Sequence, residues 1–263
     1  MHAVRFIRHA GLAFLLACSP LALAQAKKAP AAYEPTSGQE GKDVVWVPTP
    51  QILVDKMLDM AKVTPTDFVM DLGSGDGRTV ITAAKRGVRA LGVEYNPDMV
   101  ELSKRNAEKA GVAGKASFVK ADLFETDFSK ATVITMFLLP QINLQLRPKI
   151  LALKPGTRIV SNSFTMDDWE ADEIATLTSD NGCTTSWCKA LLWIVPARAE
   201  GTHKLPQGEL ALKQNFQMLS GTLTTAGKTF ALDSGRVRGE EITFKAGGKE
   251  YRGRMNGKTL ELR

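Results

Sequence analysis

Histidine and cysteine are scarce in this chain, whose 263 residues include three of each. Two of the histidines, His2 and His9, lie close to the N-terminus, so His203 is the only imidazole in the remaining chain. Transition-metal sites in proteins need clusters of imidazole, thiolate or carboxylate ligands. With so few soft ligands available, the sequence predicts no metal site.

Dense basic runs are missing as well. The formal net charge is +6, but the lysines and arginines are scattered along the chain and form no cluster of the kind that marks a nucleic-acid-binding surface. We therefore expect no nucleic-acid partner. The apolar stretch near the N-terminus is too short for a transmembrane helix. The hydrophobic content of 44% is that of an ordinary globular chain with a sizeable core.

Residues 1–26 have the three parts of a signal peptide. Arg5 and Arg8 give a positive start, an apolar stretch follows, and Ala24-Gln25-Ala26 supplies a small-x-small cleavage pattern. We expect cleavage there and a periplasmic or otherwise exported protein, with no transmembrane segment in the mature chain. Two alternatives are a lipoprotein modified at Cys18 and an uncleaved N-terminal membrane anchor.

Removal of the signal peptide leaves Cys183 and Cys188 as the cysteines of the mature chain. In an oxidising compartment, two cysteines this close in sequence can close a small disulfide loop. Closeness in sequence does not ensure the geometry that a disulfide requires. The pair is therefore a disulfide candidate, and two free thiols are the alternative.

The chain changes character twice along its length. Residues 27–47 are rich in Ala, Lys, Pro, Gly and Glu, and predict a flexible lead-in. Residues 48–200 alternate between short apolar runs and helical patterns, which predicts an α/β domain with a parallel sheet and helices on both faces. The expected strands are 68–72, 89–93, 117–120, 132–137 and 157–161, with helices at 79–86, 98–110 and 141–152 and a closing antiparallel hairpin at 174–178 and 189–196.

Residues 201–263 have a different period, because apolar residues alternate there with polar ones. Turn pairs recur, among them Ser234-Gly235 and Asn256-Gly257, and the second of these is a strong hairpin signal. The pattern predicts an antiparallel β-meander of about five to seven short strands. A segment of about 60 residues buries only a marginal core, so we expect the meander to pack on the preceding domain or to curl into a small barrel.

The most informative stretch is DLGSGDGR at 71–78, which follows an apolar strand and precedes a helix. Gly73, Gly75 and Gly77 let the backbone turn tightly and let a ligand approach it closely. The helix that follows points its free N–H groups and its partial positive end toward that ligand. This order of strand, glycine turn and helix predicts a ligand-binding loop.

The charges around this loop indicate which ligand it suits. A dinucleotide would bring its pyrophosphate beside Asp71 and Asp76, which is unfavourable in a partly buried site, whereas a sulfonium would be attracted. The second strand ends in Glu94, where an acid can accept hydrogen bonds from both ribose hydroxyls. After the third strand, Asp122 can bind the adenine amino group and Leu123 can cover the ring, although capping a helix is an alternative role for Asp122. Three acids at three strand ends favour S-adenosylmethionine (SAM) over NAD.

With these residues the chain resembles the class I SAM-dependent methyltransferases, which have a seven-stranded sheet. DLGSGDGR is similar to their first motif, GVEYNP to the acidic loop after the second strand, and KADLFE to the adenine loop. Across roughly 45–197, including VWVPTP and FLLPQINLQLRPKI, the chain also resembles the small protein-lysine methyltransferases that act on the c-subunit of ATP synthase. The resemblance does not extend to the C-terminal meander.

The resemblance implies a Rossmann-like fold, SAM as cofactor, and a methyl acceptor that is a protein or a small molecule. A protein lysine is one such acceptor. It also implies that the segment before the first strand, around 47–49, lies over the methionine end of the cofactor. The cofactor-binding residues that it implies are Asp71, Gly73, Ser74, Gly75, Gly77, Glu94, Asp122 and Leu123.

Phe137 and Leu138 follow the fourth strand, at the carboxyl edge where ligands bind in such sheets. They are candidates for the wall of an apolar acceptor channel, which would lower the pKa of a lysine entering it. Packing in the core is the alternative role for both residues.

A second class of function stays open at this point. SAM is made in the cytoplasm, and a protein outside it has no obvious supply. An exported, non-catalytic protein that binds SAM or another nucleoside, or a scaffold protein on the same fold, is therefore the alternative to an enzyme.

Overall fold

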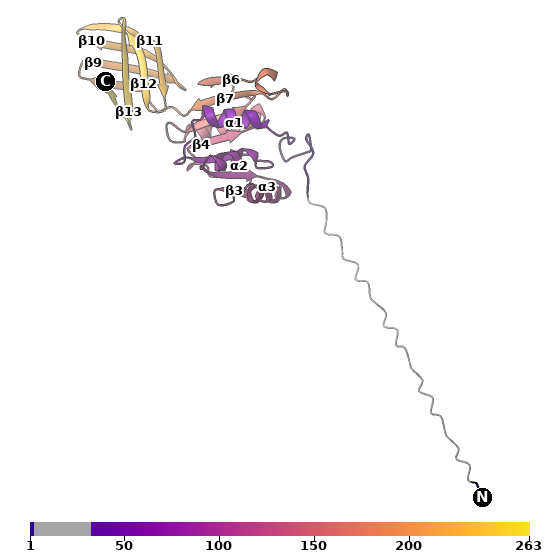
Figure 1. Ribbon diagram of the computed structural model, residues 1–263. Helices are drawn as coiled ribbons and strands as arrows, with labels where there is room; N and C mark the ends of the chain where they lie inside the picture. The colour runs from indigo at the N-terminus through magenta and orange to yellow at the C-terminus, as the bar shows by residue number, and fades with distance from the viewer. Residues whose placement is uncertain (3–32) are drawn as a thin grey trace. The chain divides into compact units, whose positions relative to one another are not determined.

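A computed structural model describes residues 1–2 and 33–263. The signal peptide, with Cys18 and the cleavage site, falls almost entirely outside the described residues, so its processing stays a prediction. Residues 33–263 contain two seven-stranded sheets that follow one another along the chain (Figure 1).

The first sheet has the strand order β3-β2-β1-β4-β5-β7-β6. The first five strands pair in parallel, and β7 is inserted antiparallel between β5 and β6. The predicted α/β sheet with a closing antiparallel hairpin is therefore confirmed. Its strands are β1 Phe68–Leu72, β2 Arg89–Glu94, β3 Ala116–Lys120, β4 Val133–Met136, β5 Arg158–Asn162, β6 Glu173–Thr176 and β7 Lys189–Ile194.

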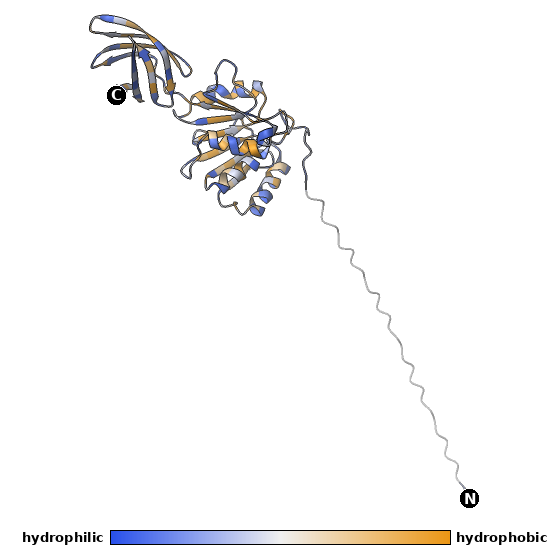
Figure 2. Cartoon of the chain, turned by 45° about the horizontal axis from the view of Figure 1, so that its top comes forward, coloured by the Kyte–Doolittle hydropathy of each residue, from blue (hydrophilic) through white to orange (hydrophobic). Residues whose placement is uncertain are grey.

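Helices cover both faces of this sheet and bury two separate apolar layers. The helices are α1 Gln51–Met60, α2 Arg78–Lys85, α3 Pro97–Lys109 and α4 Pro140–Leu151, with the short 3-10 turn η1 Ser179–Asn181. Buried residues of α1, α2 and α3 pack together on one face, and those of α4 pack with Trp169 and Trp193 on the other. Apolar residues accordingly concentrate between the helices and the strands (Figure 2).

Local sequence explains where the helices begin at the carboxyl edge of the sheet. The side chain of Asn96 accepts a hydrogen bond from the backbone N–H of Asp98, and Pro97 occupies the first helical position of α3, as helix starts prefer. Pro140 has the same place in α4. Both helices thus start immediately after a strand and bring their first residues to the edge where ligands bind.

Among the helices of the described residues, none combines the length and the apolar character needed to cross a membrane.

The second sheet is an antiparallel meander with the strand order β14-β13-β12-β11-β10-β9-β8. Its seven strands lie within the predicted range, and its two edge strands approach each other without pairing, so the sheet nearly closes. Its strands are β8 Gly201–Leu205, β9 Gly208–Asn215, β10 Met218–Thr225, β11 Lys228–Arg238, β12 Glu241–Ala246, β13 Lys249–Asn256 and β14 Thr259–Leu262.

One predicted turn in this sheet is wrong. Ser234-Gly235 lies inside the long strand β11, where the register with both neighbouring strands shifts. Ser234 has a positive φ of 55°, and a Cβ on Gly235 would lie 2.5 Å from the carbonyl oxygen of Leu219. The pair therefore forms a β-bulge, for which glycine is as suitable as it is for a turn.

The second sheet contacts the segment that precedes β6. The carboxylate of Asp172 is fully buried and pairs with the guanidinium of Arg236 at 2.6 Å. The amide of Gln217 donates to the carbonyl oxygen of Glu170 at 2.7 Å, and the rings of Trp169 and Phe216 stack with centroids 5.8 Å apart. The meander thus packs on the preceding domain and is also nearly closed on itself.

The sequence predicts a flexible lead-in over 27–47, and its flexibility stays a prediction. We call residues 33–49 the strap, of which residues 39–49 line a pocket at the first sheet's carboxyl edge. The backbone N–H of Gly38 donates to the carbonyl of Trp46 at 2.8 Å, and that of Trp46 donates to Gln39 at 2.9 Å. These hydrogen bonds, and the contacts described below, give the strap a defined path.

Candidate active site

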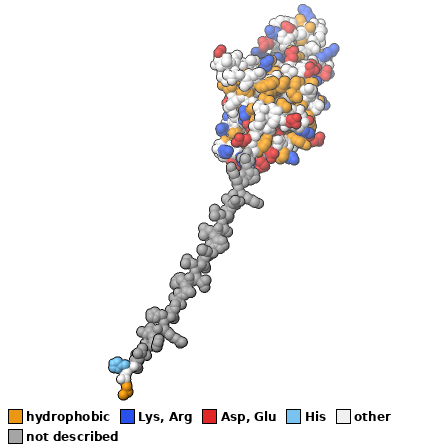
Figure 3. Space-filling model, turned by 90° about the vertical axis from the view of Figure 1, so that its right-hand side faces the viewer, with side chains coloured by type: hydrophobic (Ala, Val, Ile, Leu, Met, Phe, Trp, Pro, Cys, Tyr) orange, Lys and Arg blue, Asp and Glu red, His pale blue; other side chains and the backbone are white. Residues whose placement is uncertain are grey.

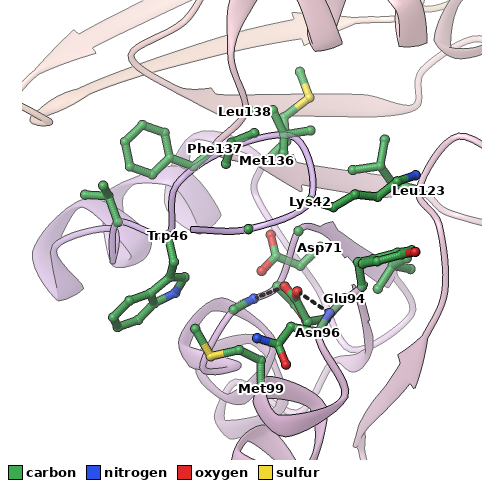
Figure 4. A pocket seen from close by; sticks show the side chains of 18 of the residues that line it. Lys42, Trp46, Asp71, Glu94, Asn96, Met99, Leu123, Met136, Phe137 and Leu138 are labelled. Carbon is green, nitrogen blue, oxygen red and sulfur yellow. Dashed lines mark hydrogen bonds between the residues drawn. The ribbon is translucent and has the colours of Figure 1, made fainter. Parts of the chain in front are cut away.

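One pocket lies where β1, β2 and β4 end, and the strap forms its cover (Figure 4). It is lined by the glycine loop, the residues after β2, the residues after β3, and the segment after β4. Of the predicted site residues, the pocket lining includes Asp71, Gly73, Ser74, Gly75, Glu94, Asp122, Leu123, Phe137 and Leu138. Gly77 is not part of the lining but lies next to it in the loop.

The glycine loop has a backbone that other residues adopt with difficulty. Gly73, Gly75 and Gly77 have φ angles of 77°, 52° and 82°. A Cβ on Gly75 would lie 2.4 Å from the indole nitrogen of Trp46. One on Gly77 would lie 2.8 Å from the ring of Phe118. The sequence DLGSGDGR thus meets two demands at once, a left-handed turn and close packing around it.

Asp71 is the buried charge of the pocket. Thr135 donates its hydroxyl to this carboxylate at 2.6 Å, yet burial raises the pKa of Asp71 to about 7, with further contributions from the charges of Asp76 and Glu94. A buried carboxylate surrounded by other acids is stabilised by a cation. The site therefore suits a positively charged ligand, as the sequence predicts.

Glu94 is held in place by backbone donors on both carboxylate oxygens. Its Oε2 accepts from the N–H of Gly75 at 2.9 Å, and its Oε1 accepts from the N–H of Asn96 at 2.9 Å (Figure 4). Each oxygen retains a further lone pair. The glycine loop and α3 thus orient a carboxylate that can still accept hydrogen bonds from a ligand's hydroxyls.

Asp122 lies at the other side of the pocket and has a partner that the sequence did not indicate. Its carboxylate accepts from the N–H of Phe124 at 2.9 Å and forms an ion pair with Lys42 of the strap. The hydrogen bond from Lys42 lowers the pKa of Asp122. The Lys42 ammonium also lies 4.8 Å from the ring centroid of Tyr95. No periodic pattern marks Lys42, so sequence reasoning missed it.

The strap is fastened to the glycine loop through Arg78. The guanidinium of Arg78 donates to the carbonyl of Thr49 at 2.9 Å and pairs with the carboxylate of Asp76 at 2.6 Å. Asp76 therefore lines the pocket with its charge compensated by Arg78. The strap covers the pocket from Trp46 at one end to Lys42 at the other (Figure 4).

The two acceptor-channel candidates occupy different environments. Leu138 is buried, with 3% of its surface exposed, and it faces both the core and the pocket. Phe137 is only partly buried, and its ring contacts Phe164 and Trp187. These last two aromatic residues were missed because they come from distant segments. The one available signal for Trp187 was its position next to Cys188.

The structure joins Cys183 and Cys188 in a disulfide, with Cα atoms 6.0 Å apart. The loop that it closes connects η1 to β7 and contains Trp187. Both cysteines are buried.

The residues present fit SAM on the criteria that the structure provides. Asp71, Glu94 and Asp122 offer carboxylates for the cationic amino acid, the ribose and the adenine amino group, and Leu123 offers an apolar surface for the ring. The hydroxyl of Ser74 is buried and has no hydrogen-bond partner within the described residues, which leaves it free for a ligand.

Comparisons with known proteins agree with this geometry. The family model described as "ANTKMT methyltransferase domain" matches residues 71–173. A protein-lysine N-methyltransferase of Saccharolobus islandicus is 48% identical over 141 residues, which are 52% of this chain and 88% of that protein. A mouse lysine N-methyltransferase, named for the c-subunit of ATP synthase, is 33% identical over 162 residues, or 61% of this chain and 62% of the mouse protein.

A solved structure gives the same fold with a related ligand. It is described as an RNA methyltransferase from Salinibacter ruber in complex with S-adenosylhomocysteine (SAH), and it is 44% identical to this chain. The likeness covers 58% of this chain and 95% of that one, with a TM-score of 0.53. Because the chain covers nearly all of two relatives at more than 40% identity, the family is clear. This chain belongs to the class I SAM-dependent methyltransferases, in the group related to the protein-lysine N-methyltransferases.

Proposed function

We propose that this enzyme methylates the side-chain nitrogen of lysine in a protein. Support comes first from the names of its relatives, because the archaeal and mouse proteins are both described as lysine N-methyltransferases. The relative described as an RNA methyltransferase has a similar identity, so names alone do not separate the two acceptor classes. The few bases and the apolar residues of the pocket favour lysine.

The pocket lining is acidic and offers few bases to a polyanion. It contains six acids, Glu40, Asp43, Asp71, Asp76, Glu94 and Asp122, and two bases, Lys42 and Arg78. A nucleic acid brings one negative charge per nucleotide and is bound through basic residues. Asp71, Glu94 and Asp122 are the carboxylates offered to SAM, so they do not select the acceptor. The apolar residues Met136, Phe137 and Leu138, which can surround a neutral amine, are the observation on which the proposal depends.

The chemistry requires positioning and desolvation from the chain's own residues. When bound, SAM supplies a methyl group whose bond to sulfur breaks as the acceptor nitrogen bonds to its carbon, which leaves SAH. The acceptor must arrive as a neutral amine, and apolar surroundings lower the pKa of lysine. Met136, Phe137 and Leu138 provide such surroundings at the end of β4. Holding the two reactants close together accounts for several powers of ten in rate.

The test is methyl transfer from radiolabelled SAM to a cell-envelope extract from cells that lack this protein. We expect label in protein, recovered as methyl-lysine after acid hydrolysis, with the wild-type enzyme and not with the Gly75→Arg variant. Label that is removed by ribonuclease and resists protease would assign the RNA class instead. SAM binding by calorimetry without any label transfer would indicate a binding protein.

We also propose that the enzyme acts outside the cytoplasm. The signal-peptide pattern of residues 1–26 and the disulfide between Cys183 and Cys188 support this compartment, because disulfides persist where conditions are oxidising. A tag placed after Arg263 should fractionate with the periplasm or the envelope. A matched chain that lacks residues 2–26 should remain in the cytoplasm, and equal distribution of the two would contradict export.

A further inference from the structure

Three aromatic rings from three distant segments meet beside the pocket. The ring centroids of Phe137 and Phe164 are 5.9 Å apart, those of Phe137 and Trp187 are 5.4 Å apart, and those of Phe164 and Trp187 are 5.7 Å apart. We call these three residues the aromatic cluster. All three are partly exposed, although burial of such large rings is the usual outcome in a folded protein.

The aromatic cluster is continuous with the pocket. Phe137 belongs to both, because it lines the pocket and contacts the two other rings. Phe137 is the first residue after β4. The next two residues are Leu138, which also lines the pocket, and Leu139, which is 38% exposed. An extended side chain that reaches the pocket past Phe137 would therefore pass Phe164 and Trp187.

The backbone around Phe164 and Trp187 is held by specific contacts. Phe164 follows Ser163, which has a positive φ of 61°, and the amide of Asn143 donates to the carbonyls of Phe164 and Thr165 at 3.4 and 3.1 Å. Residues in such rare backbone conformations concentrate at functional sites. Trp187 is held by the disulfide that joins Cys188, its neighbour, to Cys183.

The segment 167–173, which begins shortly after Phe164, contains five acids and no base. Asp168, Asp172 and Glu173 form ion pairs with arginines, and the side chain of Asp172 is buried. The cluster therefore offers its rings, rather than these acids, to a ligand. One face of the molecule shows apolar side chains gathered in its middle, with charged side chains of both signs around them (Figure 3).

We propose that the aromatic cluster is the binding surface for the acceptor lysine, and that the Cys183–Cys188 disulfide is the device that positions Trp187 in it. The proposal rests on the proposed function and names the surface where that substrate binds. The apolar stem of a lysine packs against the rings, and its ammonium is attracted by their faces.

The cluster also suits the chemistry of the transfer. The lysine nitrogen is neutral when it attacks and becomes positively charged as its bond to the methyl carbon forms. The three ring centroids lie within 5.9 Å of one another, so a cation that rests on the exposed side of the cluster can lie within about 6 Å of more than one ring, the range of a cation–π interaction. The same rings can hold a trimethylated lysine, whose charge does not depend on pH because its nitrogen has no proton to lose.

The first test compares two substitutions of one residue. Leucine at 187 keeps an apolar side chain without an aromatic face, and phenylalanine keeps the face. We expect Trp187→Leu to raise the KM for labelled envelope protein about tenfold with a smaller change in kcat, and Trp187→Phe to stay within about threefold of wild type. The affinity for SAM should be unchanged in both. The matched control is Phe230→Leu in the second sheet, which should change neither.

The second test concerns the disulfide. Replacing both cysteines by serine should raise the acceptor KM as Trp187→Leu does, while calorimetry shows wild-type SAM affinity. Combining the serine pair with Trp187→Leu should add little, because both changes remove the same contact. Additive losses, or a serine pair with wild-type KM, would overturn the positioning role of the disulfide.

A third measurement does not depend on turnover. Saturation-transfer NMR with the SAH-bound protein would use two probes, N-acetyl-trimethyl-lysine amide and N-acetyl-norleucine amide, which share a four-carbon stem and differ in charge. We expect transfer from aromatic protons to the N-methyl protons in wild type, a strong loss in Trp187→Leu and in Phe164→Leu, and no loss in Phe230→Leu.

The outcomes separate this proposal from the proposed function. If wild type labels lysines and both leucine variants label them equally well, the cluster is not the binding surface. If wild type labels no lysine, the proposed function fails, and the NMR probes alone decide whether the cluster binds alkylammonium groups. Equal transfer to norleucine and trimethyl-lysine would show an apolar contact only and would overturn the cationic part.

Discussion

The two seven-stranded sheets of this chain place their polar groups differently. In the first sheet, Asp71, Thr135 and Ser161 are buried at the carboxyl ends of β1, β4 and β5. In the second sheet, the buried polar side chain among the described residues is Gln217, whose amide is used in the contact with Glu170. Burial of polar groups costs free energy. In the first sheet, Asp71 lines the pocket and accepts a hydrogen bond from Thr135, so these two buried polar groups belong to the site.

The glycines follow the same division. In the first sheet's loop they have positive φ and other side chains packed around them. At hairpin tips of the second sheet, Gly227, Gly248 and Gly257 also have positive φ, but a Cβ there would meet nothing within 4 Å. Gly247, beside Gly248 at the same tip, is crowded by the ring of Phe230, so a crowded glycine marks a site only where it also lines a pocket, as Gly75 does.

The largest difference between the two sheets is expected when one glycine of each kind is replaced by arginine. Gly75→Arg should lower SAM affinity about 100-fold or more, because the side chain would enter the space that Trp46 and the ligand share. Gly257→Arg carries a similar backbone strain at an open hairpin tip and should leave SAM affinity unchanged. Calorimetric titration with SAM checks both, and equal effects would mean that strain alone matters.

The same site allows a finer test of crowding. A Cβ on Gly75 would meet the indole of Trp46, so part of the loss in Gly75→Ala should be recovered when Trp46→Ala is added. A double-mutant cycle on SAM affinity measures this coupling. Strict additivity would show that the strap does not restrict the loop.

The second prediction concerns the buried carboxylate of the first sheet. Asp71→Asn keeps the shape and can still accept from Thr135, but it removes the charge, so SAM affinity at pH 8 should fall about 30-fold, the size of a charge-assisted interaction. In wild type, SAM affinity should rise between about pH 5.5 and 7.5 by at most about tenfold per unit, since the cation favours ionised Asp71. The variant should lack this dependence.

The pKa of Asp71 also determines how pH acts on the cofactor-free protein. Burial raises this pKa to about 7 from its ordinary value of 3.8, so between these pH values the folded chain keeps a proton that the unfolded chain has lost. The free energy of unfolding contributed by this group therefore falls as pH rises through this window. Asp71→Asn should flatten that decline in urea unfolding curves, and a steeper decline would contradict the assignment.

Much of this could be predicted from the sequence, because local signals agree there with the fold. The strand, the glycine turn and the helix at 68–86 follow from apolar runs, from glycine and from helix-forming residues. Ser234-Gly235 was misread because glycine after a small residue suits both a turn and a bulge, and only pairing with β10 and β12 decides between them.

The parts that the sequence did not predict depend on contacts between distant segments. Lys42 meets Asp122 across the pocket, and nothing in the composition of the strap indicates that partner. Phe164 and Trp187 are joined to Phe137 only by the fold. Local patterns encode periodicity and turns, whereas a site assembled from four segments requires their arrangement in space.

The third prediction concerns the ion pair between Asp172 and Arg236, which joins the second sheet to the preceding domain. Asp172→Asn should lower the free energy of unfolding by about 1 kcal/mol, because it weakens the pair with Arg236, whose side chain is 38% exposed and partly screened. SAM affinity should not change, since the contact does not belong to the pocket. Thermal unfolding and calorimetry together check this, with Glu250→Gln as the exposed control.

The smallest expected effect is at Lys42, where the strap meets the adenine end of the pocket. The ion pair with Asp122 is partly exposed on both sides, and solvent-exposed pairs contribute little to stability. Lys42→Met keeps the stem and removes the ammonium, which leaves the Asp122 carboxylate fully available to an adenine amino group. We therefore expect SAM to bind up to about fivefold more tightly, with an unchanged KM for the acceptor. Weaker binding of SAM would mean that the ion pair between Lys42 and Asp122 is needed to hold the strap over the pocket. In that case Lys42 would stabilise the bound cofactor instead of competing with it for Asp122.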